Sequence, residues 1–534
     1  MSKTTVKTIV KEHCGILLFF LSSLLTCEVY PSLNKYVFYL TVFITGLYCM
    51  RVLIKKSALS SRFFAALGVA CVIALYFFVS LGSFYPDYFQ PSERIMFSYP
   101  YSGWNFYNAQ AFAFKKGGIA FPYEPSDKLK NFDSTYDNTA LKKSLSHEKN
   151  DYIMDLSYYK GRYYMYFGIT PILTFYLPFY YAAGKFIPDS VAVLFFSTAA
   201  FIAAFIILNK LLSVFAPSRD FVLEFLKTLA LGLSSLFVFI ISYPRVYEAA
   251  ISSGVFFGLL SYLFLLFFLK NKNKSIFLFF SGLSAALAVG CRPFYVLAIF
   301  AQIFVFVDFK EIKSKYKIYV SYFVPIFIYA VFLAAYNYIR FDSPFEFGAK
   351  YQLANVDMYS WKITAGYVAG AVKNFLFLKP IPVIDFPYVL FEKVLIRNSL
   401  PEACVGLIYT APFCAMAVTG FSYFKSKSIA PEYKKFTASI FLCGAMILLV
   451  VSSVGNLYRY MVDFSVYFII PSIVFAFYYL ETLKGYKKYI MRFFMTFTML
   501  AAITFCCAIL VSLHSYRGVN MKSAQVIKTF SSIF

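Results

Sequence analysis

The densest run of polar and aromatic side chains lies between Asp155 and Gly168. Its sequence, DLSYYKGRYYMYFG, contains one carboxylate, two cations and five tyrosines. A carboxylate can take the proton of an attacking hydroxyl group, while Lys160, Arg162 and Tyr163 can hold a phosphorylated ligand. An aromatic belt at the headgroup level of a membrane also explains the tyrosines and cations, but it does not need Asp155. We therefore predict that Asp155 is a catalytic base, with the belt as the alternative.

Further ionisable side chains stand at the ends of apolar runs: Arg245, Tyr247, Glu248, Arg292, Arg459 and Asp463. Charge in such a position is costly unless it is paired or faces a polar cavity. Arg459 and Asp463 are four residues apart and can pair with each other on one helix. Glu248 and Arg292 have no local partner, so we expect them to line a cavity in which Arg292 binds an anion. Tyr247 and the other cations of this group are candidate ligand contacts.

A third polar group occupies residues 337–352, with the sequence NYIRFDSPFEFGAKYQ. Its mixture of Arg340, Lys350 and side-chain amides suits a phosphate or polyhydroxyl ligand. A structured turn that merely leaves the membrane is an equally weighted alternative. Both interpretations place this group directly after an apolar run.

The elements that carry these groups must be membrane helices. The chain has 534 residues, of which 60% are hydrophobic, 22% aromatic and 14% charged, which excludes a water-soluble globule. Apolar runs of a length that crosses a bilayer as helices predict an all-α polytopic membrane protein with about 13 spans. The expected spans are 14–30, 36–50, 63–83, 190–208, 228–243, 250–269, 275–290, 294–308, 319–337, 403–421, 436–454, 464–482 and 493–512.

The short basic connectors predict the orientation of the spans. All of them fall on one side if the N-terminus is cytoplasmic, which agrees with the positive-inside rule. An odd number of spans then places the C-terminus outside. The chain accordingly divides into a three-helix segment 1–83, a first external segment 84–189 with interfacial helices near 105–116 and 172–183, a central bundle 190–337, a second external segment 338–402, and a C-terminal membrane segment with an external tail, 403–534.

Composition also excludes several classes of function. The net charge of +24 follows from cytoplasmic lysines and arginines, so it does not indicate a nucleic-acid partner. The 10 cysteines lie in or beside apolar runs and none has CxxC spacing, while the 3 histidines are scattered. We therefore expect no disulfide framework, no metal site and no cofactor. The first apolar run lacks a small-residue cleavage site and is expected to be a retained helix.

Several strings of this chain resemble bacterial membrane glycosyltransferases of the GT-C fold, including the serotype-converting O-antigen glucosyltransferases. The matching strings are Tyr107 to Ala111, Tyr136-Asp137, Asp155 to Gly168, Pro244 to Ala249, Arg292-Pro293, Arg340 to Gly348 and Arg459 to Phe464. The resemblance implies a bacterial inner-membrane enzyme that takes a sugar, expected to be glucose, from undecaprenyl phosphate. The acceptor would be a surface glycan such as the O-antigen of lipopolysaccharide, on the periplasmic side.

We interpret Asp155 as the base of an inverting transfer, with Asp87 and Glu248 as reserve carboxylates. Fixed cations would stabilise the departing lipid phosphate: Lys160, Arg162, Arg245, Arg292 and Arg340. Lys350 and Arg459 are further candidates for substrate binding. The expected partners are the lipid-linked donor, the glycan acceptor, the bilayer, and membrane proteins that make and flip the donor. A polysaccharide polymerase and a transporter or flippase remain alternatives, although a transporter should place charges at mid-membrane and show repeats.

Overall fold

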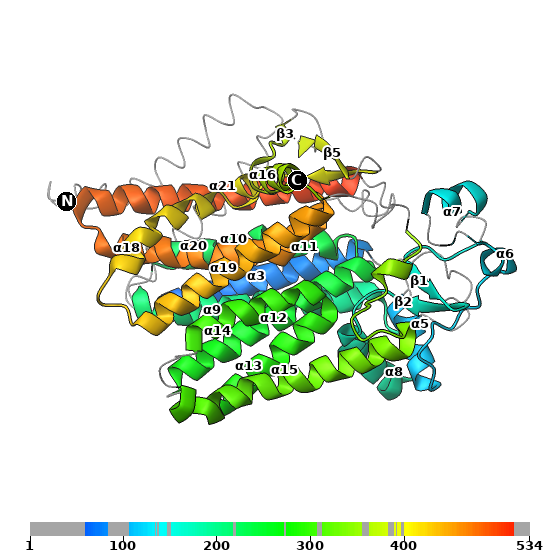
Figure 1. Ribbon diagram of the computed structural model, residues 1–534. Coiled ribbons are helices and arrows are strands. Elements are labelled where there is room, and N and C mark those ends of the chain that lie inside the picture. Colours follow the sequence, from blue (N-terminus) through cyan, green and yellow to red (C-terminus); the bar gives the residue numbers. More distant parts are fainter. Residues whose placement is uncertain are drawn as a thin grey trace.

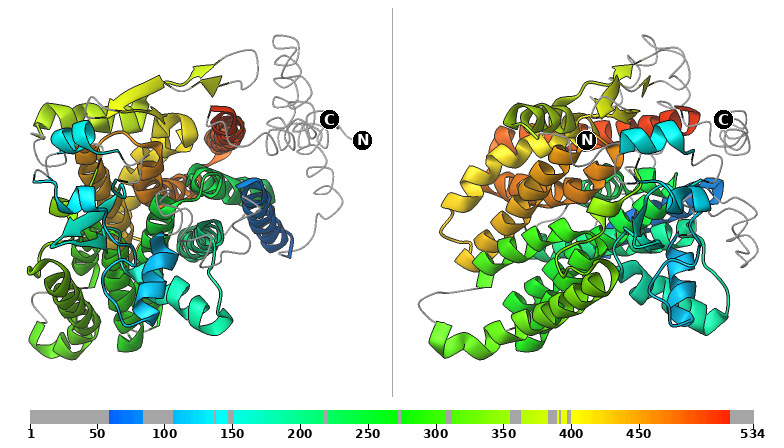
Figure 2. Two further views of the ribbon diagram at one scale, coloured as in Figure 1. Left: turned by 90° about the vertical axis from the view of Figure 1, so that its right-hand side faces the viewer. Right: turned by 45° about the vertical axis from the view of Figure 1, so that its right-hand side comes forward.

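The computed structural model describes residues 59–83, 106–133, 135, 138–146, 151–216, 220–271, 274–306, 312–354, 363–382, 389–390, 392–396 and 400–516. Helices dominate this part of the chain, and most of them lie along one common direction (Figures 1 and 2). The expected spans 14–30 and 36–50, the string Tyr136-Asp137 and the reserve carboxylate Asp87 lie outside the described residues.

Seven helices are long and apolar enough to cross a membrane, which confirms an α-helical protein of the membrane type. They are α3 (Leu59–Ser83), α9 (Asp189–Phe215), α12 (Val246–Lys270), α15 (Ile312–Phe341), α19 (Pro431–Val454), α20 (Met461–Thr482) and α21 (Gly485–Tyr516). Prolines occur inside α15 and α20, at Pro325 and Pro471, where each removes a backbone donor from its helix. Each of these helices coincides with one of the expected spans.

Four further expected spans fall on shorter or interrupted helices. Residues 228–243 are divided between α10 (Phe221–Ser234) and α11 (Phe237–Ile241), because Leu236 has a φ of 66° and ends the helix. Residues 275–290 form α13 (Ser275–Cys291), and 294–306, the described part of the span 294–308, form η5 (Pro293–Tyr295) and α14 (Val296–Phe306). Residues 403–421 are divided among α17 (Leu407–Thr410), η8 (Pro412–Thr419) and α18 (Gly420–Lys425). Seven helices, rather than thirteen, therefore meet the length of a span within the described chain.

The directions of the helices bring the basic connectors together at one end of the bundle. The α3 helix runs parallel to α10, since Phe64 packs against Phe221 at 4.7 Å and Tyr76 donates a hydrogen bond to the Gly232 carbonyl at 2.5 Å. The α12 and α13 helices run antiparallel, because Phe264 packs against Phe280 at 5.4 Å and Phe267 packs against Phe277 at 5.8 Å. The helix ends that flank these connectors lie on the left in Figure 1: the C-terminal ends of α9, α12, α14, α18 and α20, and the N-terminal ends of α10, α13, α15, α19 and α21. We call this the connector end.

The opposite end, on the right in Figure 1, carries most of the remaining elements. They are α5 (Phe106–Lys115), α6 (Asp127–Lys130), α7 (Asn138–Ser144), β1 (Leu156–Tyr159), β2 (Arg162–Met165), η4 (Ile172–Tyr176), α8 (Leu177–Ala183) and η7 (Ala349–Tyr351). The helices expected near 105–116 and 172–183 are present as α5 and as η4 with α8. We call this the hairpin end, after the antiparallel pair β1 and β2.

Strands are a departure from the purely helical expectation. Besides β1 and β2, the chain forms two more antiparallel pairs: β3 (Ile381–Pro382) with β4 (Val389–Leu390), and β5 (Glu392–Ile396) with β6 (Leu400–Cys404). All three pairs fall in segments that were expected to lie outside the membrane or at its edge. The helix α16 (Ala365–Phe377) lies in the same region and packs on α20 through Phe375 and Phe464, whose ring centroids are 5.5 Å apart.

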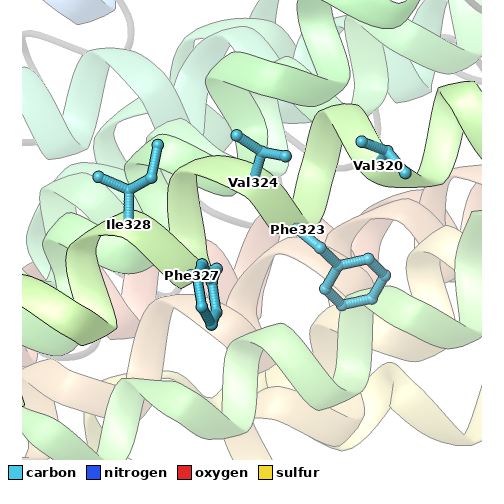
Figure 3. A pocket seen from close by; sticks show the side chains of 5 residues that line it. All are labelled: Val320, Phe323, Val324, Phe327 and Ile328. Atoms are coloured by element: carbon cyan, nitrogen blue, oxygen red, sulfur yellow. The ribbon is translucent and has the colours of Figure 1, made fainter.

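One face of α15 is apolar and exposed. Val320, Phe323, Val324, Phe327 and Ile328 line a shallow depression there (Figure 3). Phe327 is 71% exposed, a value expected for a side chain that faces hydrocarbon rather than water. This face therefore marks the lipid-facing side of the bundle.

Glycines allow the helices to approach closely. A Cβ atom at Gly282 of α13 would collide with the backbone carbonyl of Tyr322 in α15. Backbone atoms cannot move aside as a flexible side chain can. Gly370 in α16, by contrast, has open space where its Cβ would lie.

We expect Gly282→Ala to lower the unfolding temperature of the detergent-solubilised protein, because overpacking of this kind costs about 1–3 kcal/mol. Gly370→Ala is the matched control and should leave the temperature unchanged or raise it slightly. Equal temperatures for the two variants would contradict the close packing of α13 and α15.

Candidate functional site

The string from Asp155 to Gly168 forms a β-hairpin at the hairpin end. Its turn residues, Lys160 and Gly161, have φ values of 47° and 74°, as two-residue hairpin turns require. The strands β1 and β2 pair from Leu156 with Met165 to Tyr159 with Arg162. Asp155 directly precedes the first paired residue, so the hairpin fixes its place in the molecule.

Asp155 is held by both its backbone and its side chain. Its amide donates to the Leu353 carbonyl at 2.9 Å, and the Leu353 amide donates to the Leu156 carbonyl at 2.9 Å. The hydroxyl of Tyr247 donates to Oδ2, while Nε2 of Gln352 donates to Oδ1 at 3.2 Å. Its φ of 66° lies in the left-handed region, which a non-glycine residue adopts at a cost of about 1 kcal/mol or more. Such strain at a partly buried carboxylate is typical of functional positions.

Two arginines lie on the ring of Tyr247. The guanidinium carbon of Arg459 is 4.6 Å from the centroid of this ring, and that of Arg245 is 5.4 Å from it. Arg459 is 8% exposed and belongs to η9 (Tyr458–Tyr460), whereas Arg245 precedes α12 and has a side chain that is 25% exposed. Tyr247 therefore connects the carboxylate to two cations that come from distant parts of the chain.

These neighbours set the basicity of Asp155. Burial raises its pKa above the ordinary value for an aspartate. The hydrogen bond from Tyr247, the charge of Arg459, the hydrogen bond from Gln352 and the charge of Arg245 oppose this rise, in that order, without cancelling it. A carboxylate with a raised pKa is a better proton acceptor than an ordinary one, which suits a general base.

Glu248 has a local partner, contrary to the sequence expectation, and Arg292 has a partner that is distant in sequence. Glu248 is completely buried, and the Nε atom of Arg245 lies 3.6 Å from its Oε2. Arg292 pairs with Asp463 at 3.3 Å, where the expected partner of Asp463 was Arg459. Asp463 is also completely buried and accepts a hydrogen bond from Tyr295 at 3.3 Å. The helical spacing suggested the wrong pair because η9 precedes α20, so Arg459 does not share the regular helix of Asp463.

Arg292 still belongs to the same group of cations. Its guanidinium carbon lies 5.1 Å from the ring centroid of Tyr460, and that of Arg459 lies 5.8 Å from the same ring. The site thus contains three arginines and three carboxylates: Arg245, Arg292, Arg459, Asp155, Glu248 and Asp463. We call this set the charged cluster.

Several predicted ligand residues lie away from the charged cluster. Lys160 stands at the tip of the hairpin and pairs with Asp342 at 2.6 Å, and both side chains are largely exposed. The four residues of β1 separate it from Asp155, and these five residue steps span roughly 16 Å at the usual rise of a strand. Arg162 is exposed at the same tip, and Lys350 is exposed in η7. These three residues are not brought together with the candidate base.

Arg340 and Tyr163 are buried and support the hairpin. The Nη1 atom of Arg340 donates to the Met165 carbonyl at 2.7 Å, and its Nη2 atom donates to Oδ1 of Asn337 at 2.6 Å. Tyr163 accepts a hydrogen bond from the Ile153 amide at 3.3 Å. These contacts indicate structural roles, in which Arg340 joins the end of α15 to β2.

Another buried carboxylate, Asp189, was not singled out in the sequence. Asp189 begins α9 and accepts a hydrogen bond from the Tyr176 hydroxyl at 2.5 Å. The ring of Tyr176 stacks on that of Tyr107 at 5.0 Å, so the string near Tyr107 is part of this packing. Asp189 follows a proline and starts a helix, a common position for a capping carboxylate that carries no functional signal. Gln352 was noticed only as part of a polar mixture.

Among the described residues, no group of three or more histidine, cysteine, aspartate or glutamate side chains is arranged to hold a metal ion. Comparisons of the chain with protein-family models, with curated proteins and with solved structures find no match. The chemistry of the site must therefore be argued from its own residues.

The Arg292–Asp463 pair gives a test of the charged cluster. Arg292→Ala leaves a fully buried carboxylate without its cation, which costs about 3–5 kcal/mol. We expect a large drop in the unfolding temperature, and a smaller drop for the double variant Arg292→Ala/Asp463→Asn, in which that charge is also removed. A double variant that unfolds at the same temperature as Arg292→Ala would show that the pair contributes little.

Proposed function

We propose that this protein is a membrane glycosyltransferase that moves a sugar from a polyprenyl phosphate to a hydroxyl group of a glycan. The observation that carries the proposal is the setting of Asp155: a partly buried carboxylate, fixed by Tyr247 and Gln352, beside Arg245 and Arg459. A base and a set of cations are the two groups that such a transfer needs. The resemblance of the Asp155 string to GT-C enzymes supports the same class.

In this reaction Asp155 takes the proton of the acceptor hydroxyl as its oxygen attacks the anomeric carbon. The bond from that carbon to the phosphate oxygen breaks, and the lipid phosphate leaves with one more negative charge. Arg245 is the best placed cation to meet this charge, since it is the most exposed arginine of the charged cluster. Glucose is the expected sugar, and inversion is the expected outcome.

The proposed enzyme lies in a bacterial inner membrane with about 13 spans and with the hairpin end in the periplasm. Two features support this orientation. The basic residues of the described turns lie at the connector end, as the positive-inside rule requires of the cytoplasmic side. The polar hairpin and its charged cluster lie at the other end, where a surface glycan is found.

Reporter fusions test this orientation. Fusions that end at Lys274 or Lys317 should report a cytoplasmic position, and fusions that end at Gly184 or Asp342 should report a periplasmic one. The connector end carries the excess of lysine and arginine, so it should stay inside. A periplasmic signal at Lys274 would contradict the proposed orientation.

Replacement of the base is the decisive test of function. Asp155→Asn keeps the size of the side chain but removes its basicity, so transfer should fall by about two to four orders of magnitude. The measurement is the composition and linkage of the surface polysaccharide, together with sugar release from a synthetic polyprenyl-phosphate glucose. Because burial raises the pKa of Asp155, wild-type transfer should decline on acidification at a higher pH than an ordinary aspartate would give.

Glu124→Gln is the matched control, because this carboxylate is 92% exposed and remote from the charged cluster. It should leave transfer unchanged. If Asp155→Asn stays active while Asp87→Asn or Glu248→Gln is inactive, the base is a different carboxylate of the same enzyme. If Asp155→Asn, Asp87→Asn and Glu248→Gln all transfer sugar normally, none of these carboxylates is the base and the proposed mechanism is wrong. If the wild-type protein transfers no sugar from the lipid phosphate, the glycosyltransferase proposal is wrong, and a polymerase or a transporter takes its place.

A further inference from the structure

The segment between Gly348 and Leu353 lies along the candidate base as an added edge strand. Ser157 and Gln352 form an antiparallel bridge. The Asp155 amide donates to the Leu353 carbonyl, and the Leu353 amide donates to the Leu156 carbonyl, each at 2.9 Å. The Ser157 hydroxyl also donates to the Gly348 carbonyl at 2.8 Å. The segment is therefore bonded to the strand that begins directly after Asp155.

We propose that this segment positions Asp155, and that Gln352 is a positioning residue that aims the carboxylate rather than a ligand contact. The proposal rests on the proposed function, because it assigns a role to residues around the same base. It replaces the expectation that residues 337–352 bind a phosphate or a polyhydroxyl ligand.

Some of these contacts fix the backbone of Asp155, and others fix its carboxylate. The amide of Asp155 is fixed by Leu353, which holds the left-handed backbone at this residue. One carboxylate oxygen is fixed by Gln352 and the other by Tyr247, so the carboxylate plane cannot rotate without breaking a hydrogen bond. A base that is held in one orientation loses less freedom in the transition state.

Gly348 makes the approach possible. Its φ of 95° is a conformation that residues with a side chain rarely adopt, and a Cβ there would lie 2.5 Å from Oγ of Ser157 and 2.9 Å from Cζ of Phe341. Two backbone amides donate hydrogen bonds to the Glu346 carboxylate, that of Gly348 at 2.7 Å and that of Lys350 at 3.3 Å. These hydrogen bonds shape the turn that leads into the segment. A side chain at Gly348 is therefore strained by its φ and displaces the Ser157 hydroxyl, which bonds this segment to β1.

The segment also continues directly from α15, which is bonded to the same hairpin. Arg340 binds the Met165 carbonyl, and Asp342 accepts hydrogen bonds from Tyr159 at 2.8 Å and Lys160 at 2.6 Å. The end of α15 and the segment thus contact the hairpin at its tip, its middle and its base. Asp155 lies at the base of the hairpin, next to the last of these contacts.

The first experiment measures the position of the backbone without any substrate. Hydrogen exchange of the Asp155 and Leu353 amides is followed by mass spectrometry in the full-length protein in detergent. Gly348→Ala should speed the exchange of both amides by about tenfold or more, because their hydrogen bonds open more often. Gly366→Ala in α16, which has open space around its Cβ, is the matched control and should leave both rates unchanged. Unchanged rates in Gly348→Ala would overturn the proposal.

The second experiment tests the role of Gln352 in transfer. Gln352→Glu keeps the size but places a second carboxylate beside Asp155, which raises the pKa of the base. The acid limb of the pH profile of transfer should move up by about one pH unit, with the unfolding temperature unchanged. Gln352→Ala should lower kcat and move the limb in the same direction by less. A profile identical to wild type in both variants would show that Gln352 does not act on the base.

The outcomes separate this inference from the proposed function. If the wild-type protein transfers no sugar, the proposed function fails, whatever the exchange rates show; if Asp155→Asn transfers sugar normally, Asp155 is not the base and the positioning role fails with it. If Asp155→Asn is inactive but Gly348→Ala is fully active despite faster exchange, the function stands and the positioning role is wrong. Loss of transfer in Gly348→Ala together with faster exchange, in a protein that unfolds at the normal temperature, supports both.

Discussion

Burial of charge at the hairpin end is the constraint on which the site depends. An ionised group that is removed from water is several kcal/mol less stable unless another charge or hydrogen bonds compensate it. Glu248 and Asp463 are completely buried, and each lies within ion-pair distance of an arginine. Tyr247 connects the remaining groups, since its hydroxyl binds Asp155 and its ring lies against two guanidinium groups. The apolar bundle can hold these groups only because they compensate one another.

The same constraint explains the shape of the backbone around the site. The hairpin departs from helical structure at a place where the chain returns to the bundle, and its polar groups are met by the end of α15. Arg340 illustrates the principle, because a buried guanidinium binds a strand carbonyl that lacks a partner in its own hairpin. The left-handed conformation of Asp155 persists for the same reason: the surrounding hydrogen bonds determine it more strongly than its own preference does.

The sequence predicted the long helices because a hydrophobic run that crosses a membrane must satisfy its backbone hydrogen bonds internally, which a helix does. It also predicted α5 and α8, whose apolar residues recur at helical spacing. The hairpin was not predicted, because its tyrosines suggested a membrane belt, although Lys160-Gly161 between two aromatic runs is a turn signal that could have indicated it. Its function, like the roles of the arginines, stays a prediction until transfer is measured.

Pairing of charges was the least predictable feature. Sequence spacing favoured Arg459 with Asp463, since only local pairs can be read from a chain, whereas Asp463 pairs with Arg292 from a helix far away in sequence. Gln352 likewise reaches Asp155 across 197 positions of sequence. Contacts of this kind depend on how the helices pack, and packing is decided by glycines and side-chain shapes that no spacing rule contains.

The charge balance of the cluster fits the proposed reaction. Its three arginines and three carboxylates sum to zero when all are ionised, so a neutral cluster would receive a donor with one negative charge on its phosphate. When Asp155 accepts the proton of the acceptor hydroxyl, the cluster becomes positive by one charge. At the same step the departing phosphate becomes negative by one further charge. In the proposed reaction the base would therefore do more than remove a proton: its neutralisation would release the adjacent arginines to stabilise the leaving group, and Tyr247 would couple the two halves of the transfer.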